Sequence, residues 1–188
     1  SYPHKLVAKY RNNTIKPMLF PDVITTVAKQ YNKAWILCEV NDIGDQVASI
    51  IYYDMEYENL LMTCMRGRAG QVLGHGFSGG KVQLGLKMAK APKKLGCSNI
   101  KQMIESDKLI VRDFTIINEL TTFVEKRDSF SAEEGCHDDL VMCMVIYAWA
   151  VAQDYFKEMT DQSVREELYE KDKTQLEEDM APFGFVVD

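Results

Sequence analysis

The sequence predicts an α/β domain in which helices cover a mixed β-sheet. A short apolar run rich in β-formers, 34–40, has the pattern of a strand buried on both faces. The uncharged run 140–152 places apolar residues at helical spacing, which predicts a mostly buried helix. Up to residue 64 the predicted order is strand, strand, helix, strand, helix, strand, and this order indicates a mixed sheet.

The first third of the chain supplies the elements of that order. Residues 4–12 have the pattern of an extended strand, and Asn12 and Asn13 form a turn pair. We therefore expect the segment 14–20 to return as an antiparallel hairpin partner. After it come a helix at 21–31, the strand at 34–40, a helix at 44–55 and a short strand at 60–64.

Residues 65–88 differ in composition, because this segment holds seven of the chain's eleven glycines. The short flanking runs 71–73 and 81–84 predict a β-hairpin whose glycine-rich tip lies at 74–80. A phosphate-binding loop is the alternative, but the sequence contains no G-x-x-x-x-G-K-[ST]. We therefore expect an inserted basic β-hairpin at about 65–88.

The second half of the chain alternates helices with short extended segments. We expect a helix at 98–106, a strand at 109–111, an amphipathic helix at 115–126, an irregular or extended segment at 129–134 and the helix from 140. Beyond Tyr155 the composition becomes acidic. The predicted organisation is one domain at 1–160 and an acidic C-terminal tail at 161–188, in which 181–187 packs back as a terminal strand.

Charge is distributed unevenly along the chain, whose net charge is −6. The window 59–104 contains no Asp or Glu and carries a charge of +8, so the rest of the chain carries −14. This asymmetry predicts a basic surface that binds the phosphates of a polyanion, although a solvated lysine-rich loop would have the same composition. The basic residues of the window are Arg66, Arg68, Lys81, Lys87, Lys90, Lys93, Lys94 and Lys101.

Composition also excludes several classes of protein. The longest uncharged apolar run, 140–152, is shorter than the roughly 20 residues that cross a bilayer, so we expect no membrane partner. No charged n-region followed by an apolar h-region opens the chain, so no secretory signal is expected. The five cysteines form no C-x-x-C pair, which predicts reduced thiols in a cytosolic compartment and disfavours a zinc site.

Three carboxylates are the candidate chemical groups. Asp138 and Asp139 stand immediately before the buried helix, where one aspartate would suffice as a cap and the other needs a different explanation. Glu39 lies near the carboxyl end of the strand 34–40, and ligands of open α/β sheets bind beyond the carboxyl ends of strands. Helix capping by the aspartates and an exposed or lysine-paired Glu39 are the structural alternatives.

A carboxylate that ends a central strand and an aspartate pair at the start of a later helix are the ligands that two-metal phosphodiester hydrolases use. In such sites two divalent cations about 4 Å apart are held by shared carboxylates. Hard oxygen ligands suit Mg²⁺ or Mn²⁺. The sequence therefore predicts a two-metal site that contains Glu39, Asp138 and Asp139.

Four segments, 35–41, 95–98, 133–135 and 137–142, resemble the C-terminal nuclease domain of the large terminase subunit of tailed bacteriophages. The resemblance runs from about Tyr2 to Tyr155 and is most specific at HDDLV, 137–141. It implies an RNase H-like fold with a mixed five-stranded sheet. It also implies an enzyme that cuts concatemeric double-stranded DNA during genome packaging. By this match Glu39 corresponds to the strand-end glutamate and Asp139 to the helix aspartate of the metal triad, with Asp138 as its neighbour.

The resemblance also implies partners and a missing ligand. The family's first metal ligand is an aspartate on a central strand that precedes residue 1, so we expect a strand-wide opening between the segments around Tyr10 and Leu37. The expected partners are double-stranded DNA, the packaging ATPase domain of the same polypeptide, the portal and the small terminase subunit. The expected location is the host-cell cytoplasm, at the prohead. The alternatives are a Holliday-junction resolvase or transposase-type nuclease of the same fold, and a non-catalytic DNA-binding or motor-docking module.

Overall fold

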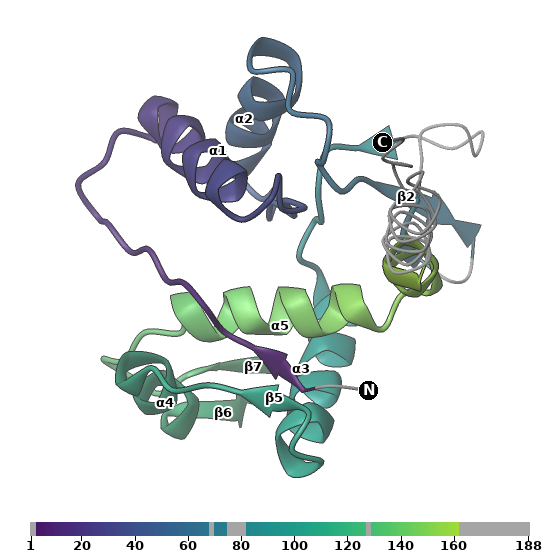
Figure 1. Cartoon of the computed structure of the whole chain (residues 1–188). Coiled ribbons are helices and arrows are strands. Elements are labelled where there is room, and N and C mark those ends of the chain that lie inside the picture. Colours follow the sequence, from purple (N-terminus) through teal and green to yellow (C-terminus); the bar gives the residue numbers. More distant parts are fainter. Residues whose placement is uncertain (1–2, 68–69, 75–81, 127–128, 162–188) are drawn as a thin grey trace, which may run out of the picture.

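Figure 1 shows the chain as a computed structural model, which describes residues 3–67, 70–74, 82–126 and 129–161. Its elements, including the short 3-10 helix η1 and the π-helix η2, follow in this order: β1 (His4–Lys5), η1 (Pro17–Leu19), α1 (Phe20–Gln30), α2 (Gly44–Ser49), η2 (Ile50–Asp54), β2 (Thr63–Arg66), β3 (Gly70–Leu73), β4 (Val82–Gln83), α3 (Lys90–Glu105), β5 (Leu109–Ile110), α4 (Phe114–Thr121), β6 (Phe123–Lys126), β7 (Ser129–Ala132) and α5 (Asp139–Val151).

Helix α5 runs through the middle of the molecule, with α1 and α2 on one side and α3, α4 and β5 to β7 on the other (Figure 1). Its apolar residues face more than one direction. Val141 and Val145 are fully buried against α3 and α4, whereas Trp149 packs with Leu61 and Leu86 in a separate cluster. The prediction of a mostly buried helix over 140–152 is therefore confirmed. A helix that is contacted on several sides needs no polar face, which explains why this run contains no charged residue.

Three small sheets replace the expected five-stranded sheet in the part of the chain that the structure describes. β1 pairs with β5 in parallel, β3 and β4 flank β2 in an antiparallel sheet, and β6 pairs with β7. The predicted strand 34–40 forms only two parallel bridges, Ile36 with Leu60 and Glu39 with Leu86. The class, a mixed α/β fold, agrees with the prediction, whereas the described residues form no single five-stranded sheet.

The predicted N-terminal hairpin is wrong. The extended strand shrinks to β1, and its partner is β5 rather than the segment 14–20. The side chain of Asn12 accepts the N–H groups of Thr14 and Ile15 at 2.8 and 2.9 Å, which closes a local turn. Pro17 then begins η1 and has no N–H to donate to a sheet.

Two further predicted boundaries are corrected. The expected hairpin partners contain β3 and β4, which lie on opposite sides of β2 and do not pair with each other. Of its expected tip, 75–80 lie outside the described residues. The helix expected at 115–126 ends at Thr121, and 123–126 form β6, because Phe123 and Val124 favour a strand and pair with β7.

The expected opening between the segments around Tyr10 and Leu37 stays a prediction. Among the described residues no ladder joins the segment 4–10 to the strand segment 36–40. Instead, a cavity of about 490 Å³ is lined by residues of the segment 4–10, of α1 and of 34–36, including Val7, Tyr10 and Ile36. Val7 and Tyr10 remain exposed. Leu6 of the same segment, in contrast, packs against the cluster around α5 and donates its N–H to the carbonyl of Ile110 at 3.1 Å.

Candidate active site

Glu39 occupies the end of a short strand with one buried face. Ile36, Cys38 and Val40 are buried, whereas Leu37 and Glu39 on the alternate positions are half-buried. This period of two corrects the prediction of a strand buried on both faces. Residues 36–39 line a cavity of about 570 Å³, and Glu39 is only partly buried beside it.

The segment that follows Glu39 is tied to the segment that begins α3. Val40 N–H donates to the carbonyl of Leu86 at 2.9 Å, and the side chain of Asn41 makes two hydrogen bonds with the backbone of Met88, at 3.0 and 3.1 Å. Two parallel segments therefore end at one edge, and α3 starts there at Lys90. This edge corresponds to the carboxyl end of parallel strands, where ligands bind in open α/β sheets.

The surroundings of Glu39 disfavour its charged form. Burial raises the pKa of the Glu39 carboxyl, Lys93 lowers it, and the charges of Asp138 and Asp42 raise it further. The net shift of this pKa is upward. The positive charge of Lys93 therefore offsets only part of the cost of burying the ionised Glu39 carboxylate. Perturbed carboxyl groups of this kind are common among residues that bind metals or protons.

We expect Glu39→Gln to raise the free energy of unfolding at pH 7 in EDTA. Because the pKa of Glu39 is higher in the folded than in the unfolded state, its ionisation costs stability as the pH rises through this interval, and glutamine removes that cost. The difference from the wild type should disappear below pH 4, where both forms are uncharged. Urea denaturation at the two pH values measures it, and Glu125→Gln, on the exposed part of β6, is the control. An equal gain at both pH values would contradict this account.

The aspartate pair does not cap its own helix through its side chains. Asp138 is the N-cap residue of α5, but its side chain makes no capping hydrogen bond and instead accepts the N–H of Ala132 in β7 at 3.2 Å. The Oε2 atom of Glu119 accepts the N–H groups of Leu140 and Val141, at 2.9 and 3.2 Å. Since Glu119 of α4 performs the capping, the structural explanation for Asp138 and Asp139 loses its main support.

The two neighbouring aspartates face different partners. Asp138 lines a cavity of about 640 Å³ together with Glu39, and its charge contributes to the raised pKa of the Glu39 carboxyl. Asp139 is not among the residues that line this cavity, and its Oδ2 lies 3.2 Å from Nη2 of Arg11. The structure thus brings Glu39 and Asp138 together and holds Asp139 beside an arginine.

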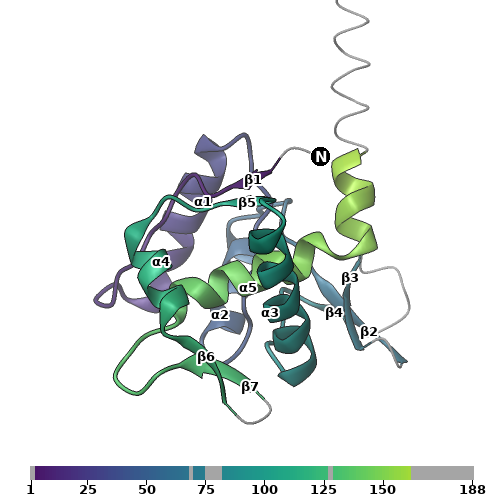
Figure 2. The same cartoon turned by 90° about the horizontal axis from the view of Figure 1, so that it is seen from below.

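The cavity that Glu39 and Asp138 share is rich in lysine. Its polar lining consists of Glu39, Asn41, Lys90, Lys93, Lys126, Ser129 and Asp138. The lysines come from the first turn of α3 and from β6, because α3 packs against the β6–β7 hairpin (Figure 2). The first turn of α3 contains no acidic residue, so the positive end of the helix dipole adds to these charges. Carboxylates and cations thus line one cavity.

The other predicted DNA-binding residues are more scattered. Arg66, at the end of β2, and Lys94, on α3, are exposed, and neither lines this cavity. The exposed Lys87 is held near β3, because Gln71 makes hydrogen bonds with its backbone at 2.7 and 3.0 Å. Arg68 and Lys81 lie outside the described residues. Of the members of the predicted set that the structure describes, only Lys90 and Lys93 therefore line the cavity.

Sequence reasoning missed three residues of this region, Lys126, Glu119 and Arg11. Lys126 lies beyond the basic window 59–104, and its position depends on the pairing of β6 with β7, whereas 123–126 was predicted as the end of a helix. A signal for Glu119 does exist in the sequence, since it lies three residues after Ile116 and one before Leu120, on the apolar face of α4. A carboxylate on an inward helix face requires a partner.

The oxygen donors of this cavity suit a hard cation. Glu39 and Asp138 contribute carboxylates and Asn41 an amide, and the described residues that line the cavity include no cysteine or histidine. This donor chemistry fits Mg²⁺ or Mn²⁺ better than zinc. Within the described ranges, no group of three or more His, Cys, Asp or Glu side chains is arranged to hold a metal ion.

A comparison with protein families identifies the family of this chain. Residues 2–165 match the family model of the terminase RNaseH-like domain. The chain therefore belongs to the terminase RNaseH-like domain family, and the prediction made from the segments around Glu39 and HDDLV is confirmed. Membership indicates a nuclease-type hydrolase role in DNA packaging, in a family that generally uses divalent metals.

The structure bears on the expected absence of a membrane-spanning segment in one respect. Among the helices that the structure describes, none is both long enough and apolar enough to span a bilayer.

Proposed function

We propose that this domain is a metal-dependent endonuclease that cuts concatemeric double-stranded phage DNA during genome packaging. The observation that carries the proposal is the cavity shared by the Glu39 and Asp138 carboxylates and the lysines of α3 and β6, in a chain of the terminase RNaseH-like family. Carboxylates that bind cations beside lysines that bind phosphates are the two components that phosphodiester hydrolysis requires.

The carboxylates have the role of metal ligands in this proposal. Glu39, Asp139 and Asp138 would hold Mg²⁺ or Mn²⁺ in a two-metal site, together with the aspartate expected upstream. The ions would supply an activated water and charge stabilisation of the leaving oxygen. The Ala132 N–H orients the Asp138 carboxylate, while the half-buried strand end positions Glu39.

The lysines have the role of phosphate contacts. Lys90 and Lys93, on the first turn of α3, and Lys126, on β6, would bind the DNA backbone beside the carboxylates. In this proposal the remaining predicted cations, Arg66, Arg68, Lys81, Lys87 and Lys94, extend the contact along the duplex. The other proposed partners are the ATPase domain of the same polypeptide, the portal and the small terminase subunit, at the prohead in the host-cell cytoplasm.

The proposal is tested by incubating supercoiled plasmid with a protein that includes the upstream strand, in Mg²⁺ or Mn²⁺ and in EDTA. We expect cutting only with the metal, and cutting that persists in EDTA would contradict the proposal. A comparison of linear and four-way-junction DNA separates this function from that of a resolvase, which would prefer the branched substrate.

The triple variant Lys90→Ser, Lys93→Ser and Lys126→Ser is expected to weaken duplex DNA binding and to flatten its salt dependence. Each lost phosphate contact removes roughly 0.9 from the log–log slope, so the slope should fall by about 2.7 if all three lysines bind phosphates. Sequence preference should change little, because phosphate contacts carry no base information. Fluorescence anisotropy over a range of salt concentrations in EDTA measures both quantities.

The matched control for the lysine variant is Lys101→Ser. Lys101 also lies on α3 but is exposed and pairs with Glu105 four residues later at 3.8 Å. Its replacement should leave the slope unchanged. If the triple variant keeps the wild-type slope, the lysines of this cavity face a partner other than DNA.

A further inference from the structure

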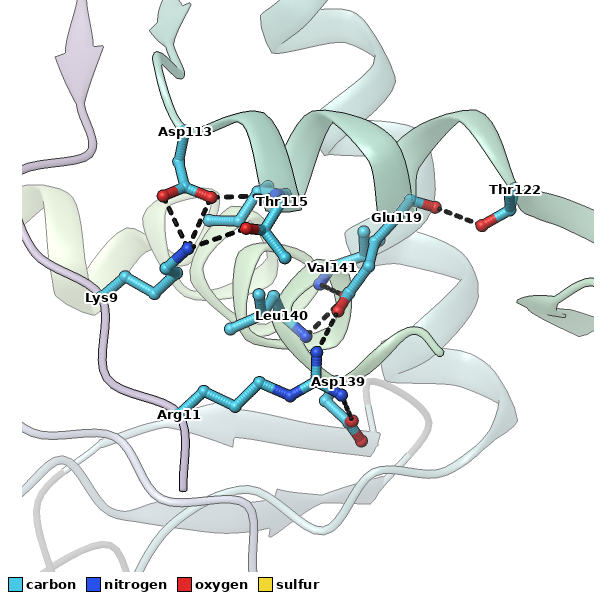
Figure 3. A network of polar contacts seen from close by, with 10 residues as sticks. Lys9, Arg11, Asp113, Thr115, Glu119, Thr122, Asp139, Leu140 and Val141 are labelled. Carbon is cyan, nitrogen blue, oxygen red and sulfur yellow. Dashed lines mark hydrogen bonds and ion pairs between the residues drawn. The ribbon is translucent and has the colours of Figure 1, made fainter. Parts of the chain in front are cut away.

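One guanidinium connects two helices beside the proposed metal site. The Nη1 atom of Arg11 lies 3.3 Å from Oε1 of Glu119 on α4, and its Nη2 lies 3.2 Å from Oδ2 of Asp139, the first residue of α5 (Figure 3). We propose that Arg11 is a positioning residue, which orients the Asp139 carboxylate for metal binding. This inference rests on the proposed function, in which Asp139 is a metal ligand.

Glu119 fixes the guanidinium relative to α5. Its side chain is only 6% exposed, and its Oε2 accepts the N–H groups of Leu140 and Val141, while Oε1 contacts Arg11. The Glu119 carboxylate is thus bound to the first turn of α5, and Arg11 contacts both this carboxylate and Asp139, the first residue of α5. The position of the guanidinium is therefore fixed relative to Asp139. The negative charge of Glu119 also balances that of Arg11, which lowers the repulsion between the guanidinium and a cation bound nearby.

The backbone on both sides of Arg11 is anchored. Before it, Nζ of Lys9 forms an ion pair with Oδ2 of Asp113 at 2.7 Å, at the start of α4. After it, the side chain of Asn12 accepts the N–H groups two and three residues further on. Since an arginine fork gains specificity when its stem is fixed in place, this anchoring favours a role in orientation.

Asp139 benefits from such a partner because its side chain is 68% exposed. An exposed ion pair alone contributes little to stability, so the pair with Arg11 has little value as a structural bond. Ligating carboxylates, in contrast, are commonly held by hydrogen bonds from a surrounding shell of residues. The contact with Arg11 uses Oδ2, so a cation can bind through Oδ1 of the same carboxylate.

The experiment measures Mn²⁺ affinity from the loss of the free-ion signal in electron paramagnetic resonance, in the wild type, Arg11→Met, Lys9→Met and Asp139→Asn. Methionine keeps the apolar stem of the side chain and removes the fork. We expect Arg11→Met to weaken Mn²⁺ binding about tenfold, the lower end for loss of a partner of a metal ligand. Lys9→Met is the matched control, because it also removes an ion pair between this segment and α4 but makes no contact with Asp139. It should leave the affinity unchanged.

The outcomes separate this inference from the proposed function. If Asp139→Asn weakens binding while Arg11→Met leaves it unchanged or tightens it, the positioning role is wrong and the metal site stands. If Asp139→Asn has no effect, Asp139 is not a ligand, and that part of the proposed function fails together with the inference. If Arg11→Met does not fold, Arg11→Lys replaces it, because lysine keeps the positive charge but lacks the two-pronged guanidinium. Wild-type Mn²⁺ affinity in Arg11→Lys would then overturn the inference.

Discussion

Glu39→Ala and Asp139→Asn are each expected to abolish the cutting of plasmid DNA, in a protein that includes the upstream strand. Removal of one carboxylate leaves the charge of the ions without compensation, and the loss of a single preorganised electrostatic group costs on the order of 10²–10³-fold in rate. The folds should survive, because Glu39 is only half-buried and lines cavities, and Asp139 is exposed. Gel assays of nicked and linear plasmid, with thermal unfolding in parallel, measure both properties.

Asp138→Asn provides a graded comparison with these two variants. Its carboxylate lines the cavity with Glu39 and also accepts a backbone N–H from β7, which asparagine can still do through its amide oxygen. We expect a partial loss of cutting. Asp154→Asn, whose side chain is 92% exposed after the end of α5, is the control that should cut normally. Full activity in Glu39→Ala would remove the central ligand of the proposed site.

Gly96→Ala is expected to lower the free energy of unfolding by about 1–3 kcal/mol, the usual cost of overpacking a well-packed core. A Cβ atom at Gly96 of α3 would lie 2.4 Å from the carbonyl oxygen and 2.7 Å from Cγ1 of Val145 on α5. The fully buried Val145 and its backbone can move only if the two helices separate. In an unhindered helix the same change would add up to about 1 kcal/mol of stability, so the sign of the effect is diagnostic.

The measurement for Gly96→Ala is urea denaturation, with Ser98→Ala on the exposed side of α3 as the control that should change stability by less than about 0.5 kcal/mol. The same variant should also weaken DNA binding, because α3 carries Lys90 and Lys93 to the cavity. A gain in stability would show that α3 and α5 do not approach as closely as the structure describes.

Local patterns were sufficient for several elements of this fold. The uncharged run from Leu140 predicted α5, and the spacing of apolar residues after Pro21 predicted α1, because both signals reside within about four turns of chain. The same patterns were insufficient for strand pairing. The segments around Val72 and Val82 each favour extended backbone, but their shared partner β2 depends on contacts that neither segment encodes alone.

The sequence by itself determined which elements carry the carboxylates: Glu39 at a strand end and the aspartate pair at the start of α5. It determined the charge asymmetry of the window 59–104 as well. These properties follow from composition and periodicity, which need no knowledge of distant residues.

Only the tertiary structure decided where each carboxylate points. Asp138 and Asp139 are adjacent in the chain, yet one turns to β7 and the cavity of Glu39 while the other meets Arg11, 128 residues away. The helix cap that they seemed to supply comes from Glu119 on another helix. The physical reason is that a carboxylate orients toward the nearest hydrogen-bond donor or cation. Folding brings these partners from distant parts of the chain, so the local sequence pattern does not reveal them.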